Sequence, residues 1–461
     1  MISWALIAAV GLMLALPIAW RIGQRRFDPF EPLVLFVLAW GAMFVARPAS
    51  VLVREEHAFV GLDVMPTFRS ALLLALVGAV GFVAGYEMRA GHRLAQRLPS
   101  PRPVDARVAT AGALVVVGLG LVALVLMLPA AEGLEALRAI FAGRNADDGL
   151  LQPSSSYVSH ASVLFAPAAF VLVGVALRER SPGIAIIAAL ALALALARVV
   201  PGGARMVLLP LLGGIFVLVY VMRTTRPRAP FLAALVVLAL LGSYFTLQLR
   251  EDTDDATLRT EVEELVRRPQ AVLDPVINGS DAEMVLALSA ALTVVPDELG
   301  HRFGGATIGN LATRPVPREL WSGKPRPPGE TVVATLWPHL YPGIDPAFSP
   351  LLVLYWDFGL VGVLLGMALF GLLARLFYEW FLLHRHAFGA QLLFSTGVWL
   401  VVIAARNDPV DTIALAAFLF GPVVAIVALA SEGLVPALFS SSRSGSGRVE
   451  RRAPDEQGKV Q

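Results

Sequence analysis

The sequence lacks cysteine, contains only two lysines among its 461 residues, and has only 16% charged residues. Without cysteine the chain has no disulfide and no catalytic thiol, and cysteine usage gives no indication of the compartment. The low charge content, set against 57% hydrophobic residues, excludes the two or three soluble domains that the length alone suggests. The net charge of +2 says little by itself, and no nucleic-acid partner is expected.

Long apolar runs recur along the whole chain, and each predicts a membrane-spanning helix. About 20 helical residues cross the hydrocarbon core, where every backbone polar group must be satisfied within the segment. We therefore expect an all-α polytopic membrane protein, held in the lipid bilayer by 11 helices. The expected spans are 2–20, 29–45, 68–87, 108–129, 157–177, 183–199, 206–222, 229–248, 350–374, 388–405 and 412–431.

The placement of the basic residues predicts the orientation. With the N-terminus outside, the cytoplasmic segments hold 20 lysines and arginines and the short outer loops hold 8, as the positive-inside rule requires. The first span is then a retained helix, because its positive charges follow it. The chain divides into helices 1–8 (1–248), a large extracytoplasmic loop (249–349), helices 9–11 (350–431) and a polar, disordered cytoplasmic tail (440–461).

The large outer loop is expected to contain short helices, because apolar residues recur at helical spacing in 256–268 and in Glu283–Val295. We expect the second helix to lie on the membrane surface. The loop also gathers cations, and Arg205 lies on the same side between two spans. Of the nine lysines and arginines in 249–349, the candidates are Arg250, Arg302, Arg314, Arg318, Lys324 and Arg326. Guanidinium forks match phosphate oxygens, so the set suits a lipid-linked pyrophosphate; the alternative is that these residues anchor helices to lipid headgroups.

The stretch "TRPVPRELWSGKPRPPGE", Thr313–Glu330, contains five prolines and four basic residues. Each proline fixes its own φ and disfavours helix in the residue before it. We therefore expect an extended, stiff segment that holds Arg318 and Lys324 at set positions. Trp321 would pack at the membrane interface or against a sugar ring, although a surface loop without a ligand is also consistent with the composition.

Three elements of the sequence resemble the bacterial O-antigen polymerases, the Wzy-type oligosaccharide repeat-unit polymerases. "VPRELWSGKP" is similar to the family's PR-x-LW-x-x-KP element, and "LYWDFGLVG" to its Y-x-D/E-FG-x-x-G element at the start of the next span. "GGAR" before a span resembles the family's G-x-R. The resemblance marks Arg205, Pro317, Arg318, Trp321, Lys324, Pro325, Tyr355, Asp357 and Gly359.

The resemblance implies a glycosyltransferase that joins polyprenyl-pyrophosphate-linked repeat units on the outer face of the inner (cytoplasmic) membrane. The product would be an O-antigen, capsule or exopolysaccharide, with a chain-length regulator and a flippase as partners. Arg205, Arg318 and Lys324 would stabilise the leaving pyrophosphate, without a cofactor or metal. Trp321 and Tyr355 would bind substrate, and Arg250 and Arg314, which no family motif marks, are expected to do so because they are cations on the same outer side.

Several alternatives remain open from the sequence. The base that takes the acceptor proton is His301, Asp357 or neither; an unperturbed histidine pKa suits that role. Asp357, expected a turn or two below the outer surface, would pair with a loop arginine or a sugar hydroxyl. "DTDD" at 252–255 resembles the metal site of nucleotide-sugar enzymes, but those donors are cytoplasmic. The rival functions are an O-antigen ligase and a transporter or flippase of lipid-linked oligosaccharide.

Overall fold

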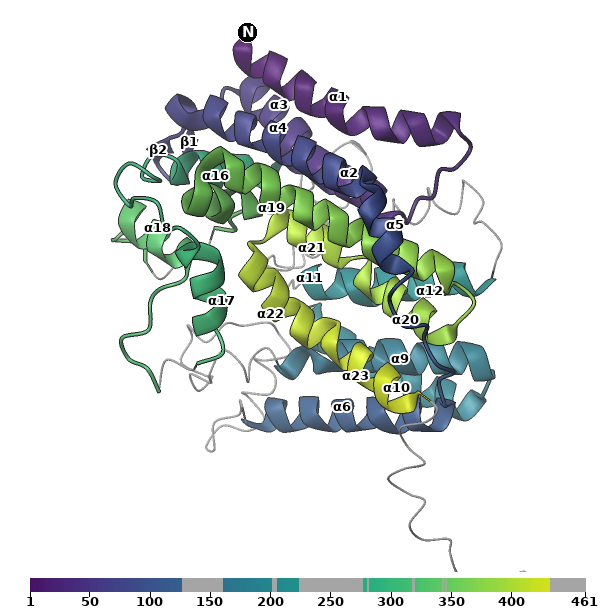
Figure 1. The fold of residues 1–461 in the computed structure, drawn as a ribbon. Coiled ribbons are helices and arrows are strands. Elements are labelled where there is room, and N and C mark those ends of the chain that lie inside the picture. Colours follow the sequence, from purple (N-terminus) through teal and green to yellow (C-terminus); the bar gives the residue numbers. More distant parts are fainter. Residues whose placement is uncertain are drawn as a thin grey trace, which may run out of the picture.

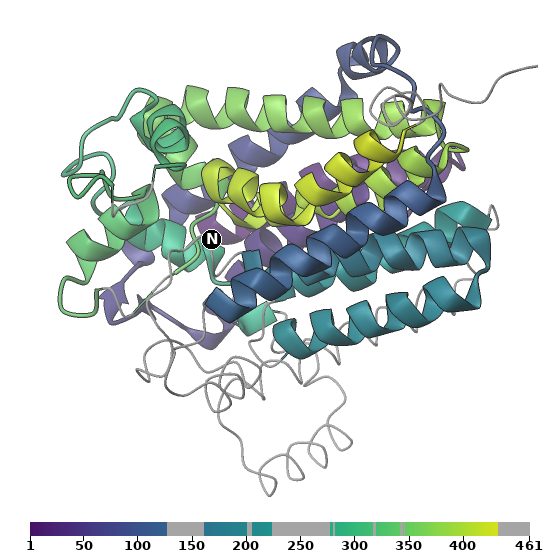
Figure 2. The ribbon, with the colours of Figure 1, turned by 90° about the horizontal axis from the view of Figure 1, so that it is seen from below.

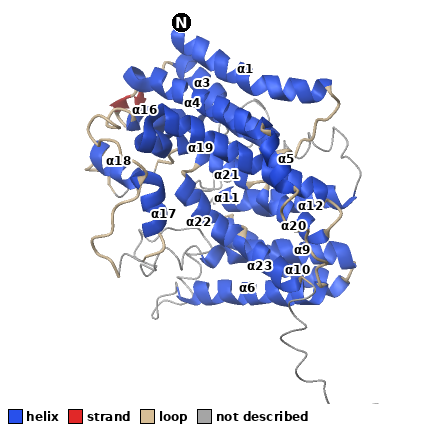
Figure 3. Cartoon of the chain, in the orientation of Figure 1, coloured by secondary structure: helices blue, strands red, loops and turns tan. Residues whose placement is uncertain are grey.

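The chain forms a bundle of helices in a computed structural model that describes residues 1–126, 161–200, 205–223, 277–279, 282–316, 320–341, 344 and 346–431. Eight described helical segments are long and apolar enough to cross a membrane, or nine if α22 (Pro409–Leu419) and α23 (Gly421–Ala430), which meet at 43°, form one bent span. The expected all-α polytopic architecture is confirmed (Figure 3). The count of 11 stays a prediction, because the expected span 229–248 lies outside the described residues, as does the tail.

The long helices lie side by side (Figure 2). They are α1 (Ile2–Gly23), α2 (Pro32–Gly41) continued by the π-helical η1 (Ala42–Ala46) and α3 (Arg47–Arg54), α4 (Met65–Glu87), α6 (Ala106–Leu126), the 3-10 turn η3 (Ser162–Leu164) with α9 (Phe165–Glu179), α10 (Pro182–Val199), α11 (Arg205–Leu208) with η4 (Leu209–Gly213) and α12 (Gly214–Arg223), α19 (Pro350–Leu383), α20 (Phe388–Gly397) and α21 (Leu400–Arg406). The shorter elements are β1 (Ala58–Phe59), β2 (Leu62–Asp63), α5 (Arg89–Ala95), α16 (Met284–Ala291), η7 (Gly305–Gly309), α17 (Asn310–Thr313) and α18 (Pro328–Leu336).

The bundle has two distinct ends. The β1–β2 hairpin, α16, α17 and α18 gather at one end, which we call the loop end, and α5 lies toward the other, which we call the α5 end (Figure 1). The loop end carries the described parts of the outer loop, as the alternation of the predicted spans requires. Which end faces the cytoplasm stays a prediction.

Two expected spans ended too early. The helix expected over 29–45 continues through η1 to Arg54, so Arg47 belongs to a helix and not to a loop. Its side chain is buried and contacts Glu56 (Nη2 to Oε2, 2.8 Å) and Asn278 (Nη1 to Oδ1, 2.9 Å). The helix expected over 350–374 continues to Leu383. The two expected ends lay beside Arg47 and Arg375, and in the structure both arginines lie within the helical segments.

The helix expected within Glu283–Val295 is present as α16, but its expected position on the membrane surface is wrong. All eight of its residues are buried. It packs against α4, α18 and α19, and the hydroxyl of Thr67 in α4 donates to the carbonyl of Ser289 (2.6 Å). A helix that is apolar all round has no face for water, which explains why α16 lies inside the loop end.

Helices α4 and α19 approach each other through glycines. A Cβ added at Gly85 would overlap the carbonyl of Ala368, and one at Gly371 would overlap the carbonyl of Phe82. Small residues allow helix backbones to come this close in membranes. The contact fixes α19, which carries much of the candidate site at its loop-end portion.

The α5 end is tied together by ion pairs between helices. Arg21 of α1 contacts Glu31 (Nε to Oε2, 2.8 Å) and Glu87 of α4 (Nη2 to Oε1, 2.9 Å). Glu379 of α19 pairs with Arg375 and accepts from His92 of α5 (Nδ1 to Oε2, 2.9 Å). Each of these buried charged groups contacts a group of opposite charge, and this contact offsets the free-energy cost of removing the charge from water.

Candidate functional site

The site is built where the 300–313 segment lies on the loop-end portion of α19. Trp356 of α19 donates from Nε1 to the carbonyl of Gly300 (2.7 Å). The Trp356 carbonyl accepts from the backbone N–H of Arg302 (3.1 Å) and lies 3.1 Å from Nδ1 of His301. This carbonyl is available because the helix is interrupted just after it.

The interruption lies at Phe358 and Gly359. Gly359 has φ +61° and ψ −150°, a region that only glycine adopts readily. The glycine in "LYWDFGLVG" therefore has a conformational reason, and it divides α19 into a short loop-end helix and a long membrane helix.

Asp357 is fully buried and caps the helix that starts at η7. Its Oδ1 accepts from the N–H of Ala306 (2.9 Å), and its Oδ2 accepts from the N–H and the hydroxyl of Thr307 (2.9 and 2.6 Å). Backbone N–H groups at a helix start lack helical partners and favour a negative charge. None of these bonds is with a loop arginine, one of the two expected partners; in the structure Asp357 joins η7 to α19.

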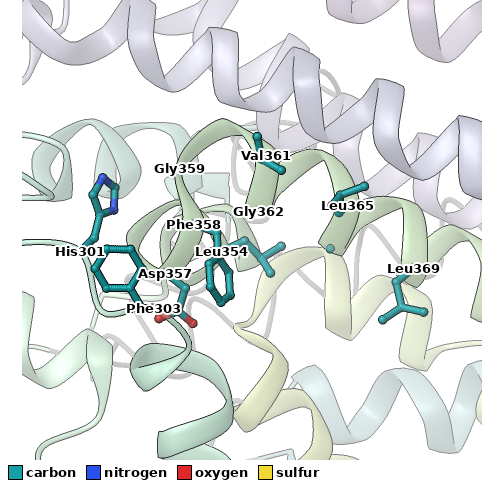
Figure 4. A pocket seen from close by; sticks show the side chains of 11 residues that line it. His301, Phe303, Leu354, Asp357, Phe358, Gly359, Val361, Gly362, Leu365 and Leu369 are labelled. Carbon is teal, nitrogen blue, oxygen red and sulfur yellow. The ribbon is translucent and has the colours of Figure 1, made fainter.

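His301 and Asp357 line one pocket of about 690 Å³, which we call the His301 pocket. Its other walls are mainly apolar side chains from the kinked part of α19. Figure 4 shows the His301 ring and the Asp357 carboxylate pointing in different directions. Tyr355 is half-buried, and its ring centroid lies 6.4 Å from that of His301. The structure brings these three candidates together without a direct bond between His301 and Asp357.

A second, strongly apolar pocket of about 510 Å³ lies along α19, α21 and α22; we call it the α19 groove. It shares Leu354, Gly366 and Leu369 with the His301 pocket. At the loop end it includes Thr307, the residue that Asp357 holds. An apolar groove in the membrane region therefore borders the polar segment.

Lys324 and Arg314 contact other parts of the loop end. The Lys324 ammonium donates to the carbonyls of Val316 (2.8 Å) and Arg314 (3.2 Å). Arg314 pairs with Asp411 of α22 (Nη2 to Oδ1, 2.7 Å). Trp321 is 40% exposed. In this arrangement Lys324 holds the proline-rich segment together, while Arg314 fastens it to the bundle.

Asp408 precedes α22 beside this ion pair and caps the helix. Its Oδ1 accepts from the N–H groups of Val410 (2.7 Å) and Asp411 (2.9 Å). Burial raises the pKa of Asp408 to about 6, and repulsion from Asp411 adds to the shift. The sequence signal for this cap, an aspartate before Pro409, is a common helix start.

For three of the candidate residues the structure describes no side chain. Arg250 and Arg318 lie outside the described residues, and for Arg205 only the backbone is described, at the start of α11. Asp252, Asp254 and Asp255 of the "DTDD" stretch also lie outside the described residues. Among the described residues no group of three His, Asp or Glu side chains is arranged to hold a metal.

The sequence analysis missed Thr307 and Trp356, which hold the 300–313 segment to α19. Thr307 has no signal in the sequence, because its partner Asp357 is 50 residues away. Trp356 lies inside the quoted motif but outside its matching positions. Comparisons with protein-family models, curated proteins and solved structures find no match for this chain.

Proposed function

We propose that this protein is a glycan polymerase that joins polyprenyl-pyrophosphate-linked oligosaccharide repeat units on the outer face of the inner membrane. The observation that carries the proposal is the position of the α19 groove. It borders the segment of His301 and Asp357, so apolar and polar surfaces adjoin at the loop end. A substrate with a hydrocarbon tail and a charged sugar head requires both surfaces side by side.

In the proposed reaction, a hydroxyl oxygen of the acceptor unit attacks the anomeric carbon of the lipid-linked donor. The bond from that carbon to the pyrophosphate oxygen breaks, and the lipid pyrophosphate leaves with the electron pair. Arg318, Lys324 and Arg205 would stabilise the developing negative charge. The acceptor proton goes to a protein base or to water.

The geometry favours His301 over Asp357 as that base. The Trp356 carbonyl can only accept, so Nδ1 of His301 carries its hydrogen and the lone pair of the neutral ring is on Nε2. Asp357 already accepts three hydrogen bonds and is fully buried. Because the His301 side chain is exposed, its Nε2 is the better acceptor for a substrate proton.

The test is Arg318→Ala in a strain that lacks the native copy, with Arg69→Ala, an exposed arginine near the start of α4, as the matched control. Loss of one such donor costs about 10²–10³ in rate, so single lipid-linked repeat units should accumulate. Arg318→Lys should recover part of the activity, because an ammonium cannot bond two oxygens in one plane. Gel separation of the surface glycan measures chain length.

The same experiment separates the rival functions. A ligase defect would leave long polymer on the lipid carrier, and a flippase defect would leave single units inaccessible to membrane-impermeant reagents. Normal long chains from Arg318→Ala, at normal protein level, would disprove the role of this arginine.

A further inference from the structure

A smaller pocket of about 240 Å³ is lined in part by η7 and α17, and neither the proposed base nor the three cations of the proposed reaction line it. We call it the Arg302 pocket. Its walls come from three parts of the loop end: the η7–α17 turn, the end of the proline-rich segment, and Trp356 of α19. Arg302, Asn310 and Arg326 are its polar side chains of interest.

The two arginines are held by aromatic rings and not by acids. The guanidinium carbon of Arg302 lies 4.8 Å from the ring centroid of Trp356, and that of Arg326 lies 5.1 Å from the ring centroid of Tyr341. Within the described chain neither guanidinium forms an ion pair with a carboxylate. A stacked guanidinium keeps the N–H groups on its edge available for a second partner.

The nearby carboxylates are engaged elsewhere. Asp357 accepts from Ala306 and Thr307, and Glu330 accepts from the hydroxyl of Tyr341 (3.3 Å). Two guanidinium groups therefore line one small pocket and repel each other. An anion between them would remove that repulsion and add charge-assisted hydrogen bonds.

Asn310 provides a second observation that points to a ligand, and it does not depend on the two arginines. It is 9% exposed, and it lines the same pocket. Its Nδ2 has no hydrogen-bond partner among the described residues, which is unfavourable for a buried donor. Asn310 and the two arginines supply donors, so the matching ligand group brings acceptor oxygens and negative charge.

We propose that the Arg302 pocket binds an oxyanion: the carboxylate of an acidic sugar or a phosphate group. The proposal does not depend on the polymerase function, because it concerns binding alone. In a polymerase the pocket would select substrates that contain an acidic sugar, or it would bind a phosphate group other than the one bound by Arg318.

The test is calorimetric titration of the full-length protein, purified in detergent, with sodium glucuronate, sodium pyrophosphate and neutral glucose. We expect one of the two anions to bind and glucose not to bind. Arg326→Gln and Arg302→Gln should each weaken that binding at least about tenfold, which corresponds to about 1.4 kcal/mol. Arg69→Gln, at an exposed arginine of α4, should leave it unchanged. Glucuronate binding identifies an acidic sugar, and pyrophosphate binding identifies a phosphate.

Asn310→Ala separates binding from structure. It should weaken anion binding without lowering the thermal unfolding midpoint, because the Nδ2 donor has no partner to lose. If Arg302→Gln fails to fold through loss of its stacking on Trp356, the exposed Arg326 still provides the test. The proposal is wrong if neither anion binds, if binding is unchanged in Arg326→Gln, or if pyrophosphate binding depends on Arg318 and not on Arg326.

Discussion

At the scale of single residues, Asp357 is the group that fastens the 300–313 segment to α19. Asp357→Ala removes three accepted hydrogen bonds and leaves the N–H groups of Ala306 and Thr307 unsatisfied, at a cost of about 1–3 kcal/mol for each buried donor. Hydrogen exchange at these two amides should therefore become much faster in this variant. Mass spectrometry of the protein in detergent measures the exchange.

Asp357→Asn is the matched comparison, because the amide keeps one acceptor oxygen in place. We expect exchange rates between those of the native protein and Asp357→Ala. Equal exchange in all three proteins would contradict the capping role.

Asp408 gives the chain a specific dependence on pH. Its pKa of about 6 in the folded protein exceeds the ordinary value of 3.8, so the folded state retains a proton that the unfolded state loses. Its contribution to the free energy of unfolding is therefore greatest below about pH 4, falls as the pH rises to about 6, and then stays constant. The total fall is on the order of 3 kcal/mol, at about 1.4 kcal/mol for each unit of pKa difference.

Asp408→Asn keeps the helix cap and removes the titration. Its thermal unfolding midpoint should exceed that of the native protein at pH 7, and the two midpoints should converge toward pH 4. Parallel pH profiles for the two proteins would show that Asp408 does not carry this dependence.

The site residues that could be predicted from the sequence are those whose own side chains are charged. An acid at position 357 predicts a partner, because a carboxylate in this region is costly. The identity of that partner could not be predicted, since backbone N–H groups 50 residues away leave no sequence signal. The same holds for Lys324, which contacts backbone carbonyls.

At the scale of elements, the glycines between α4 and α19 set how closely the two helices pack. Gly85→Ala would place a methyl group against the backbone of Ala368. Because the overlapping atoms of Ala368 are backbone atoms, a change of side-chain rotamer cannot relieve the overlap. Overpacking of this kind costs typically about 1–3 kcal/mol, and occasionally more. The thermal midpoint in detergent should fall clearly.

Gly118→Ala in α6 is the control, because an added Cβ there has no neighbour within 4 Å. It should leave the midpoint unchanged or raise it, since alanine favours helix by about 1 kcal/mol over glycine. A fall of the same size in both variants would mean that close packing is not the cause.

Most of the long helices could be predicted from the length of the apolar runs, because a segment that spans lipid must satisfy its backbone hydrogen bonds internally and therefore forms a helix. The continuation of α2 to Arg54 could not. Arg47 and Pro48 resemble the end of a span, and only the fold brings Asn278 to Arg47. The burial of α16 depends on α4 and α19, which are far away in sequence.

At the scale of the whole molecule, the predicted orientation can be tested through the absence of cysteine. Single cysteines at Ser100 and Ser322, both exposed, should differ in labelling by a membrane-impermeant thiol reagent on intact spheroplasts. Ser322→Cys should label, and Ser100→Cys should label only after the membrane is opened. The reverse pattern would invert the orientation.

The α4–α19 contact also has a consequence for biosynthesis. Gly85 leaves the ribosome 286 residues before Gly371, its counterpart on α19. At about 5–20 residues per second, this separation lasts roughly 15–60 s. During that interval the glycine face of α4 lies in lipid without its permanent neighbour, and the loop end lacks the helix on which it is built. A ribosome that stalled before Pro350 would therefore leave an inserted but unfinished bundle, which we expect membrane proteases to recognise.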